Sequence, residues 1–158
     1  MDWKSLFFSA EGRIGRGEFW IGWLVLLGVN VVAGWIPLIG WILALVTIYC
    51  SICIYSKRLH DMGKSGWLQL IPIVICMIAG GFAFVSMGAG VMMGALSGGA
   101  DEMVAASVLG GLGIGLLALA VTFIVGVAFL LWVGLSAGEP GPNRFGEPPA
   151  KSAVPSAA

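Results

Sequence analysis

The residues most able to do chemistry lie in one short polar stretch, residues 57–67, which reads KRLHDMGKSGW. It contains the only histidine of the chain and three of its eight basic residues. Its cations, with the backbone N–H groups that start the next apolar segment, could hold a phosphate-bearing headgroup. The same residues could instead be structural, because Arg58 and Asp61 are spaced i, i+3 and can pair at a helix end.

The rest of this stretch fits a tight turn between two helices. Gly63 is suited to end one helix, Ser65 to cap the next, and Trp67 to anchor at a membrane interface. His60 and Asp61 are sequence neighbours, so on a helix their side chains point about 100° apart and cannot form a simple dyad. We therefore assign no catalytic residue and favour a protein that is not an enzyme.

Two cysteines, Cys50-x-x-Cys53, invite a metal or redox interpretation. A helix would place both thiols on one face, but only Cys76 accompanies them. Free cysteine is also an ordinary buried apolar residue, so we expect no metal and no cofactor. No acidic or basic residue falls inside the apolar segments, which argues against proton-coupled transport.

The segments that must position the polar stretch are long and apolar. The chain of 158 residues is 59% hydrophobic and 10% charged, against a usual charged share of about 25%. With a mean hydropathy of +1.00 it could not bury its apolar surface as a soluble domain, so we expect a membrane protein. A formal net charge of zero argues against a nucleic-acid partner.

Breaks in the apolar pattern predict an all-α membrane protein with four transmembrane helices. A single helix over residues 19–55 would be roughly 55 Å long, far more than a bilayer core of about 30 Å, and the sequence PLIG at 37–40 divides it. The expected spans are about 19–36, 41–56, 67–87 and 108–135, within a membrane domain of 19–137 that follows an interfacial segment, 1–18, and precedes a Pro/Gly/Ala-rich tail, 138–158.

The first residues suggest a short helix in the headgroup layer. Trp3, Leu6 and Phe7 are spaced i, i+3, i+4 and so share one helical face, with Lys4 off it. The alternative is a hydrophobic tail that becomes ordered on the first span.

The basic residues predict the orientation in the membrane. All of them lie in the N-terminal segment, the turn between spans two and three, or the tail: Lys4, Arg13, Arg16, Lys57, Arg58, Lys64, Arg144 and Lys151. The positive-inside rule then places both termini and the 57–67 turn in the cytoplasm.

A glycine-rich region around residues 80–107 allows two interpretations. Gly90, Gly94 and Gly98 recur every four residues, a spacing that lets helices approach closely in lipid and could support a homo-oligomer. The other interpretation is a flexible outer loop, since so glycine-rich a region matches the pattern by chance.

Three motifs carry a family resemblance. Residues 12–20 read GRxxRxEFW, residues 58–67 read RLHDxGxSGW, and residues 141–148 read GxNxFGxP. They resemble the signatures of the domain of unknown function 805 family, YhaH-like small bacterial inner-membrane proteins with no assigned activity. Leu68, where the family commonly has a second tryptophan, and the glycine-rich stretch depart from its pattern. The resemblance implies a bacterial inner-membrane location and four helices, but no catalytic residue.

We expect the three motifs to meet on the cytoplasmic face as one polar cluster that binds anionic membrane lipids or a protein partner. Glu18 and Asp61 should pair there with arginines, whose planar fork suits carboxylates. A small oligomeric transporter or pore is the alternative, and an enzyme acting on lipid-borne groups is a third possibility. The expected cluster consists of Arg13, Arg16, Glu18, Lys57, Arg58, His60, Asp61, Lys64, Ser65, Asn143 and Arg144.

Overall fold

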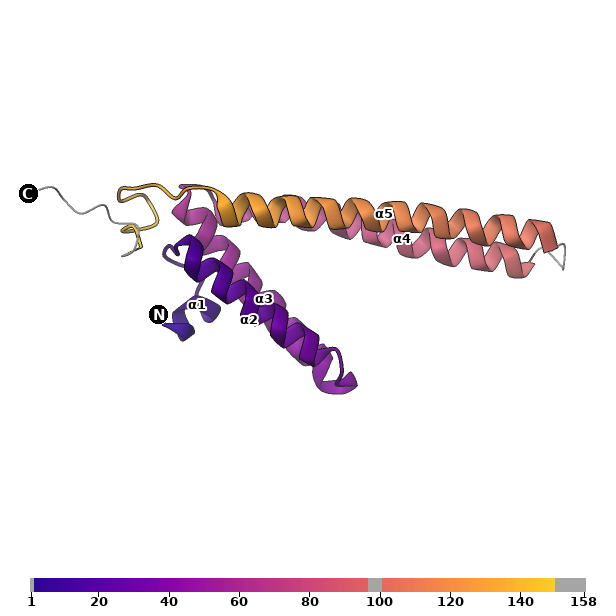
Figure 1. Ribbon diagram of the computed structural model, residues 1–158, viewed down its shortest axis with the longest axis horizontal. Helices are drawn as coiled ribbons and strands as arrows, with labels where there is room; N and C mark the ends of the chain where they lie inside the picture. Colours follow the sequence, from indigo (N-terminus) through magenta and orange to yellow (C-terminus); the bar gives the residue numbers. More distant parts are fainter. Residues whose placement is uncertain (1, 97–100, 150–158) are drawn as a thin grey trace, which may run out of the picture. The chain divides into compact units, whose positions relative to one another are not determined.

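The computed structural model describes residues 2–96 and 101–149, and its regular structure there is helical apart from one β-bridge between Asn143 and Gly146. The elements in chain order are α1 (Trp3–Phe8), α2 (Arg16–Ala33), α3 (Pro37–Asp61), the 3₁₀ turn η1 (Gly66–Gln69), α4 (Leu70–Leu96) and α5 (Asp101–Leu135) (Figure 1).

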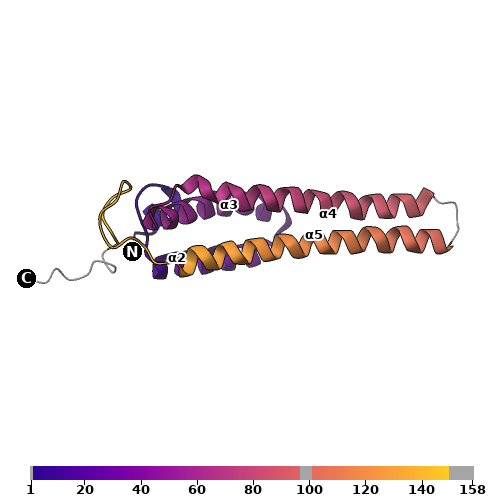
Figure 2. The ribbon, with the colours of Figure 1, turned by 90° about the horizontal axis from the view of Figure 1, so that it is seen from above.

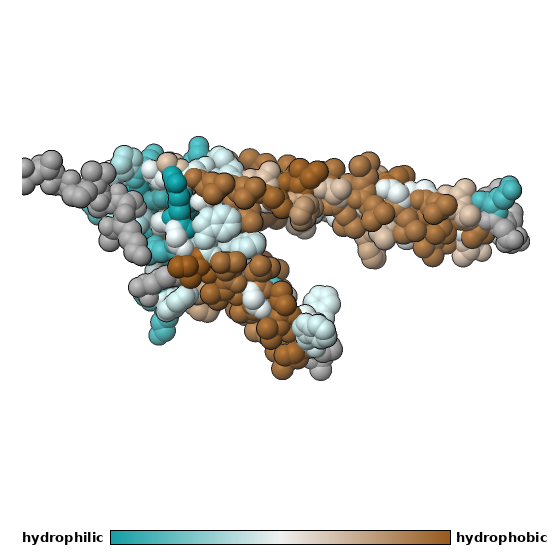
Figure 3. Space-filling view, in the orientation of Figure 1, coloured by the Kyte–Doolittle hydropathy of each residue, from teal (hydrophilic) through white to brown (hydrophobic). Residues whose placement is uncertain are grey.

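Four helical segments are long and apolar enough to cross a membrane: Arg16–Ala33, Ile39–Asp61, Gly66–Leu96 and Val104–Leu135. Large apolar side chains cover their exposed faces, as expected of surfaces that meet lipid (Figure 3). The chain divides into two compact units. The described part of the first unit is residues 2–69 with 131–149, and that of the second unit is residues 70–96 with 101–130.

In the first unit, α2 and α3 form a hairpin that packs around one aromatic side chain. Phe19 is fully buried and meets Trp20 and Tyr55 edge to face, at ring-centroid distances of 5.7 and 5.2 Å. Gly22 lets α2 approach Ile54, whose Cδ1 would lie 3.0 Å from a Cβ at that position. Aromatic pairs of this geometry stabilise beyond their buried area, so this contact fixes the hairpin.

Helix α1 lies against this hairpin. Leu6 is buried and touches the site of Gly22, whereas Trp3 stacks on Phe7 with centroids 6.0 Å apart and is itself half exposed. Leu6 thus faces the protein rather than sharing one outward face with Trp3 and Phe7, because the side of α1 that carries it rests on α2 and α3.

Local signals explain where the helices begin and end. The Gly15 N–H donates to Glu18 Oε2 (3.2 Å) at the start of α2. Gly63 follows the end of α3 with φ +68°, and the Lys64 N–H donates back to the Leu59 carbonyl (2.9 Å). This left-handed glycine ends the helix as the sequence predicts.

In the second unit, α4 and α5 run side by side as an antiparallel hairpin (Figure 2). At their closest approach, a Cβ on Gly90 would lie 2.9 Å from Gly111 Cα and 2.7 Å from the Ser107 carbonyl oxygen. One turn on, a Cβ on Gly94 would lie 3.1 Å from a methyl of Val108. The described part of the glycine-rich region is therefore helical, which decides against a flexible loop there; Gly98 lies outside the described residues.

Both helices of this hairpin extend beyond the expected spans. Helix α4 runs to Leu96 rather than to about 87, and α5 begins at Asp101 rather than at about 108. Small residues let the two backbones meet, so each helix continues as long as the other covers it.

Candidate functional site

Among the described residues, the most buried charged group is the guanidinium of Arg58, near the end of α3. Its side chain is 0% exposed and forms an ion pair with Asp61. Its Nε also donates to the Val133 carbonyl (3.1 Å), and its Nη2 donates to the Ser136 carbonyl. Since α5 ends at Leu135, Arg58 joins the end of α3 to the end of α5.

Arg13, in the segment before α2, meets the same carboxylate. Its Nε and Nη2 donate to Asp61 Oδ1 at 3.1 and 3.0 Å, and its Nη1 donates to the Gly141 carbonyl at 2.7 Å. Two arginines thus share one buried carboxylate, and backbone oxygens take their other donors. We call these three residues, Arg13, Arg58 and Asp61, the Arg–Asp–Arg network.

The segment after α5 folds back over this network. Asn143 Nδ2 donates to the His60 carbonyl (3.0 Å) and to Glu139 Oε2 (2.8 Å). The Phe145 ring stacks on the His60 imidazole with centroids 3.8 Å apart and planes 6° from parallel. These contacts order residues 139–146 despite their proline and glycine content.

Two glycines allow this segment to lie so close. A Cβ at Gly138 would overlap the Asp61 carboxylate, and one at Gly63 would overlap the Glu139 carboxylate. Gly63 is doubly constrained, because its φ of +68° also disfavours any other residue. The fold of the network therefore requires glycine at both positions.

Three further expected cations, Arg16, Lys64 and Arg144, surround the network and are exposed. Arg16 Nε donates to the Ser136 carbonyl (3.1 Å). Lys64 Nζ lies 5.7 Å from the centre of the Trp132 ring, and Arg144 Cζ lies 4.6 Å from that of Phe145. Each is positioned by one contact and keeps other donors facing solvent. Ser65 is structural, since its hydroxyl accepts the Trp67 N–H (3.4 Å).

Lys57 and Glu18 lie apart from the network, beside α1. Lys57 is 2% exposed, and its Nζ donates to the Ser5 carbonyl and lies 3.3 Å from Ser5 Oγ. The expectation that Glu18 pairs with an arginine is wrong for the described residues, where both ion pairs use Asp61. The carboxylate of Glu18 turns back instead to the Gly15 N–H at the start of its own helix.

These two residues line a cavity of about 180 Å³, which we call the Lys57 pocket. Carboxylates and an ammonium lie on its wall together, and both α1 and α2 contribute side chains. The lining residues are Asp2, Ser5, Leu6, Glu11, Gly12, Arg13, Ile14, Glu18 and Lys57.

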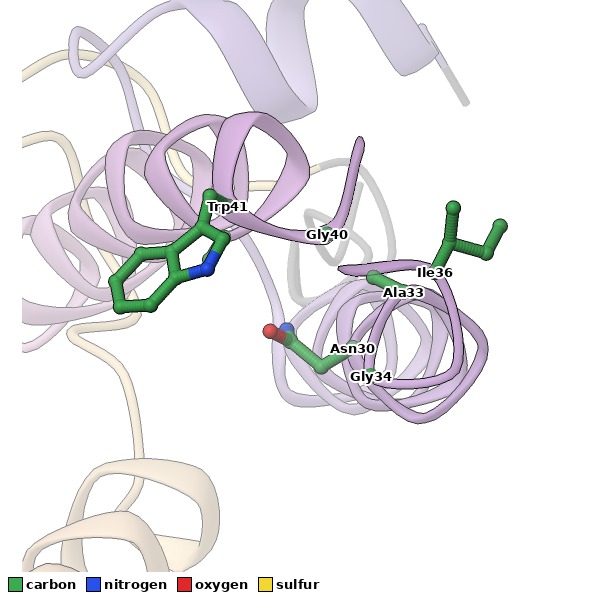
Figure 4. Close-up of a pocket in the computed structure, with 7 residues that line it drawn as sticks. Asn30, Ala33, Gly34, Ile36, Gly40 and Trp41 are labelled. Atoms are coloured by element: carbon green, nitrogen blue, oxygen red, sulfur yellow. The ribbon is translucent and has the colours of Figure 1, made fainter. Parts of the chain in front are cut away.

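A larger depression of about 350 Å³ lies at the α2–α3 turn, where Asn30 and Trp41 flank it (Figure 4). Asn30 is the only polar side chain in its lining apart from the Trp41 indole. The amide of Asn30 is already engaged, because it donates to the Leu26 carbonyl (2.8 Å) and accepts from the Thr47 hydroxyl (3.2 Å). This depression offers little to orient a ligand.

The cysteines are not grouped with other metal-ligating side chains in the part of the chain that the structure describes. Cys50 and Cys53 are free and buried in α3. Within residues 2–96 and 101–149, no three His, Cys, Asp or Glu side chains come together as metal ligands.

Sequence reasoning missed most of the groups that hold the two arginines. Their acceptors include the carbonyls of Val133, Ser136 and Gly141, and any residue can present a carbonyl. The close approach at Gly138 was the one available signal, because a glycine directly before a polar segment permits such packing.

Comparison with known proteins agrees with the motifs. The family described as "Protein of unknown function (DUF805)" matches residues 7–147. The chain is 35% identical over 94 residues to the "Uncharacterized protein YiiR" of Escherichia coli K12 and to that of E. coli O157:H7. These matches cover 49% of the chain and 59% of each relative, so the chain spans little more than half their length. No solved structure matches the chain.

Proposed function

The chain belongs to the DUF805 family of proteins of unknown function, and from that premise we propose that it is a non-enzymatic, multi-pass protein of the bacterial inner membrane whose cytoplasmic face holds anionic lipid headgroups. The observation that carries this proposal is that its cations differ in burial and in bonding. Arg13 and Arg58 are buried and engaged within the protein, whereas Arg16, Lys64 and Arg144 surround them and are exposed.

The orientation rests on where these cations lie. Every lysine and arginine belongs to the N-terminal segment, the 57–67 stretch or the tail. The Arg–Asp–Arg network bonds these three segments to one another, which supports placing them on one side of the membrane. The positive-inside rule makes that side the cytoplasm.

Helix α1 supports the same placement. Trp3 and Phe8 are exposed by 50% and 60%, and aromatic side chains of this kind favour the membrane interface. Leu6 and the Lys57–Ser5 bond hold α1 against α2 and α3. An interfacial helix fixed in this way would keep the exposed cations at headgroup level.

The network itself is better suited to a structural role than to catalysis. Asp61 is 2% exposed, and its two oxygens accept from both arginines. A catalytic acid or base must reach the proton that it transfers, and this carboxylate cannot.

Copurified lipid provides the test. The protein should retain phosphatidylglycerol or cardiolipin in preference to phosphatidylcholine when native mass spectra are recorded from mixed-lipid nanodiscs. Each basic residue near a membrane surface contributes about 1 kcal/mol, so Arg16→Gln, Lys64→Gln and Arg144→Gln together should abolish this preference. Glu147→Gln is the control. No preference for anionic lipid in the unaltered protein would refute the proposal.

Topology is tested separately with single cysteines in a variant lacking Cys50, Cys53 and Cys76. A cysteine at position 38 or 101 should react with an impermeant probe outside intact cells, and one at 64 should not. Outside labelling at 64 would reverse the orientation.

The alternative, an oligomeric transporter or pore, draws on the glycine-rich helices. Gly90 and Gly94 face Gly111 and Val108 of the same chain, so their small size already serves packing within one molecule. We therefore rank this alternative second.

A further inference from the structure

The only histidine of the chain is enclosed by segments that are distant from it in sequence. His60 belongs to the polar 57–67 stretch, beyond the apolar part of α3, and is partly buried. The Phe145 ring covers one face of its imidazole, with centroids 3.8 Å apart and planes 6° from parallel. At the edge of the imidazole, Nδ1 lies 3.3 Å from the Gly12 carbonyl. The tail and the N-terminal segment therefore both meet this side chain.

These contacts suit the neutral form of the imidazole. With its proton on Nδ1, the neutral ring can donate to the Gly12 carbonyl. A second proton would go to Nε2, which makes no hydrogen bond within residues 2–96 and 101–149 and lies 3.3 Å from the Cβ position of Gly66. The Phe145 ring also keeps water from one face, and loss of water disfavours the charged form of an ionisable group.

The charges around His60 oppose protonation as well. The Arg144 guanidinium lies over the same Phe145 ring, with Cζ 4.6 Å from its centre, so a charged imidazole would be the second cation on that ring. Asp61 already accepts from two arginines, and Glu139 accepts from an amide of the tail. Turn η1 carries no charge, and cations outnumber carboxylates on the other segments that pack against His60: Glu11, Arg13, Lys57, Arg58, Asp61, Lys64, Glu139 and Arg144.

The tail depends on His60 for part of its hold. Asn143 Nδ2 donates to the His60 carbonyl (3.0 Å), and Phe145 stacks on the imidazole. We propose that residues 139–146 form a proton-sensitive strap, which is closed over the Arg–Asp–Arg network when His60 is neutral and is loosened when His60 takes up a proton. Arg144 is one of the cations of the proposed headgroup surface, so loosening would alter that surface, but the strap is inferred from its own contacts and independently of lipid binding.

The sign of the pH dependence follows from these contacts. An imidazole ordinarily titrates near pH 6.5, so residues 139–146 should be ordered at about pH 7.5 and looser at about pH 5.5. Carboxylates, with ordinary pKa values of about 4, stay ionised over this range. Because the chain has a single histidine, the response can be assigned to one group.

The test follows the strap and the proton in the same full-length protein, purified in micelles without a histidine tag. A nitroxide on a cysteine at position 147, an exposed site directly after the strap, reports motion by EPR in a chain that lacks Cys50, Cys53 and Cys76. The NMR signal of the imidazole reports its protonation. The mobile fraction of the label should rise at least about threefold from about pH 7.5 to about pH 5.5, with the midpoint of the imidazole signal. Unchanged mobility, or a different midpoint, would overturn the proposal.

Two variants separate the proton from the packing. His60→Phe keeps a flat ring against Phe145 but takes no proton, so the label should stay immobile at both pH values. Phe145→Leu uncovers the imidazole, so the label should be mobile already at the higher pH and the response should shrink. The matched control is a label at position 110 in the second unit, where a Cβ meets nothing within 4 Å. A response retained by His60→Phe, or an equal response at position 110, would contradict the proposal. The two midpoints in the chain with native His60 and Phe145 decide it even if a variant fails to fold.

Discussion

The two units hold their helices together by opposite chemical means. In the first, a buried carboxylate shared by Arg13 and Arg58 binds segments that are distant in sequence. In the second, Gly90 and Gly111 let two apolar helices touch along their backbones. Lipid offers no hydrophobic drive between spans, so helices there need either close backbone contact or polar bonds. The first unit thus relies on polar bonds, and the second relies on close backbone contact.

Length separates the units as well. Helix α2 has 18 residues, roughly 27 Å, whereas α5 has 35 residues, roughly 52 Å. The first is close to a bilayer core of about 30 Å, and the second exceeds it. A helix of the second length must tilt strongly or extend beyond the core, and a contact that runs along two backbones can tolerate either.

Removing the shared carboxylate is expected to have the largest effect. Asp61→Ala leaves two buried guanidinium groups without their counter-ion, which should lower the free energy of unfolding by about 3–5 kcal/mol. Unfolding in mixed micelles, followed by tryptophan fluorescence, would measure it. Glu102→Ala, which removes an exposed carboxylate from the second unit, is the control. A loss below about 1 kcal/mol would mean that the first unit does not depend on buried charge.

The second unit should instead be sensitive to side-chain bulk. Gly111→Leu inserts a side chain where a Cβ would already lie 2.9 Å from Gly90 Cα, and we expect a loss of about 1–3 kcal/mol. The neighbouring Gly110 has nothing within 4 Å of its Cβ position, so Gly110→Leu should be nearly neutral in the same assay. Equal losses at the two positions would contradict the packing of α4 on α5.

The bonds that fix residues 139–146 should contribute less to stability than the Arg–Asp–Arg network. Asn143→Ala removes the bonds to the His60 carbonyl and to Glu139, a loss of about 1 kcal/mol. Limited proteolysis should then cut residues 139–146 faster, whereas Glu147→Ala should leave the rate unchanged. If the tail of the Asn143 variant stays protected, other contacts hold it.

The smallest effect is expected at Lys64, whose ammonium lies over the Trp132 ring. Lys64→Gln removes an exposed cation–π contact worth about 0.5–1 kcal/mol. The micelle unfolding assay should register no more than this. A loss comparable to that of Asp61→Ala would place Lys64 in the charged framework of the first unit.

Much of the fold could be predicted from the sequence because membrane helices are encoded by composition. Charge-free apolar runs indicate four helices, and Gly63 marks a helix end. The glycine-rich region left two interpretations open, since its composition is typical of loops in water but also of helix contacts in lipid. Only the position of Gly90 opposite Gly111 distinguishes them.

The site was harder to predict for a different physical reason. The i, i+3 spacing of Arg58 and Asp61 indicates their pairing, and the fold also brings Arg13 to the same carboxylate. Sequence could not assign Glu18, because a carboxylate near a helix start can either pair with a cation or cap the helix. It also could not show that the two arginines donate mostly to backbone carbonyls.

The first unit is interrupted in sequence by the second, which sets the order in which its parts become available. The ribosome synthesises Arg58 and Asp61 before the end of α5, and the roughly 75 residues to Val133 follow over about 4–15 s at ordinary translation speeds. During that interval Arg58 lacks the Val133 and Ser136 carbonyls that it holds in the finished fold. A chain cut short there therefore keeps an incompletely bonded guanidinium in its first unit.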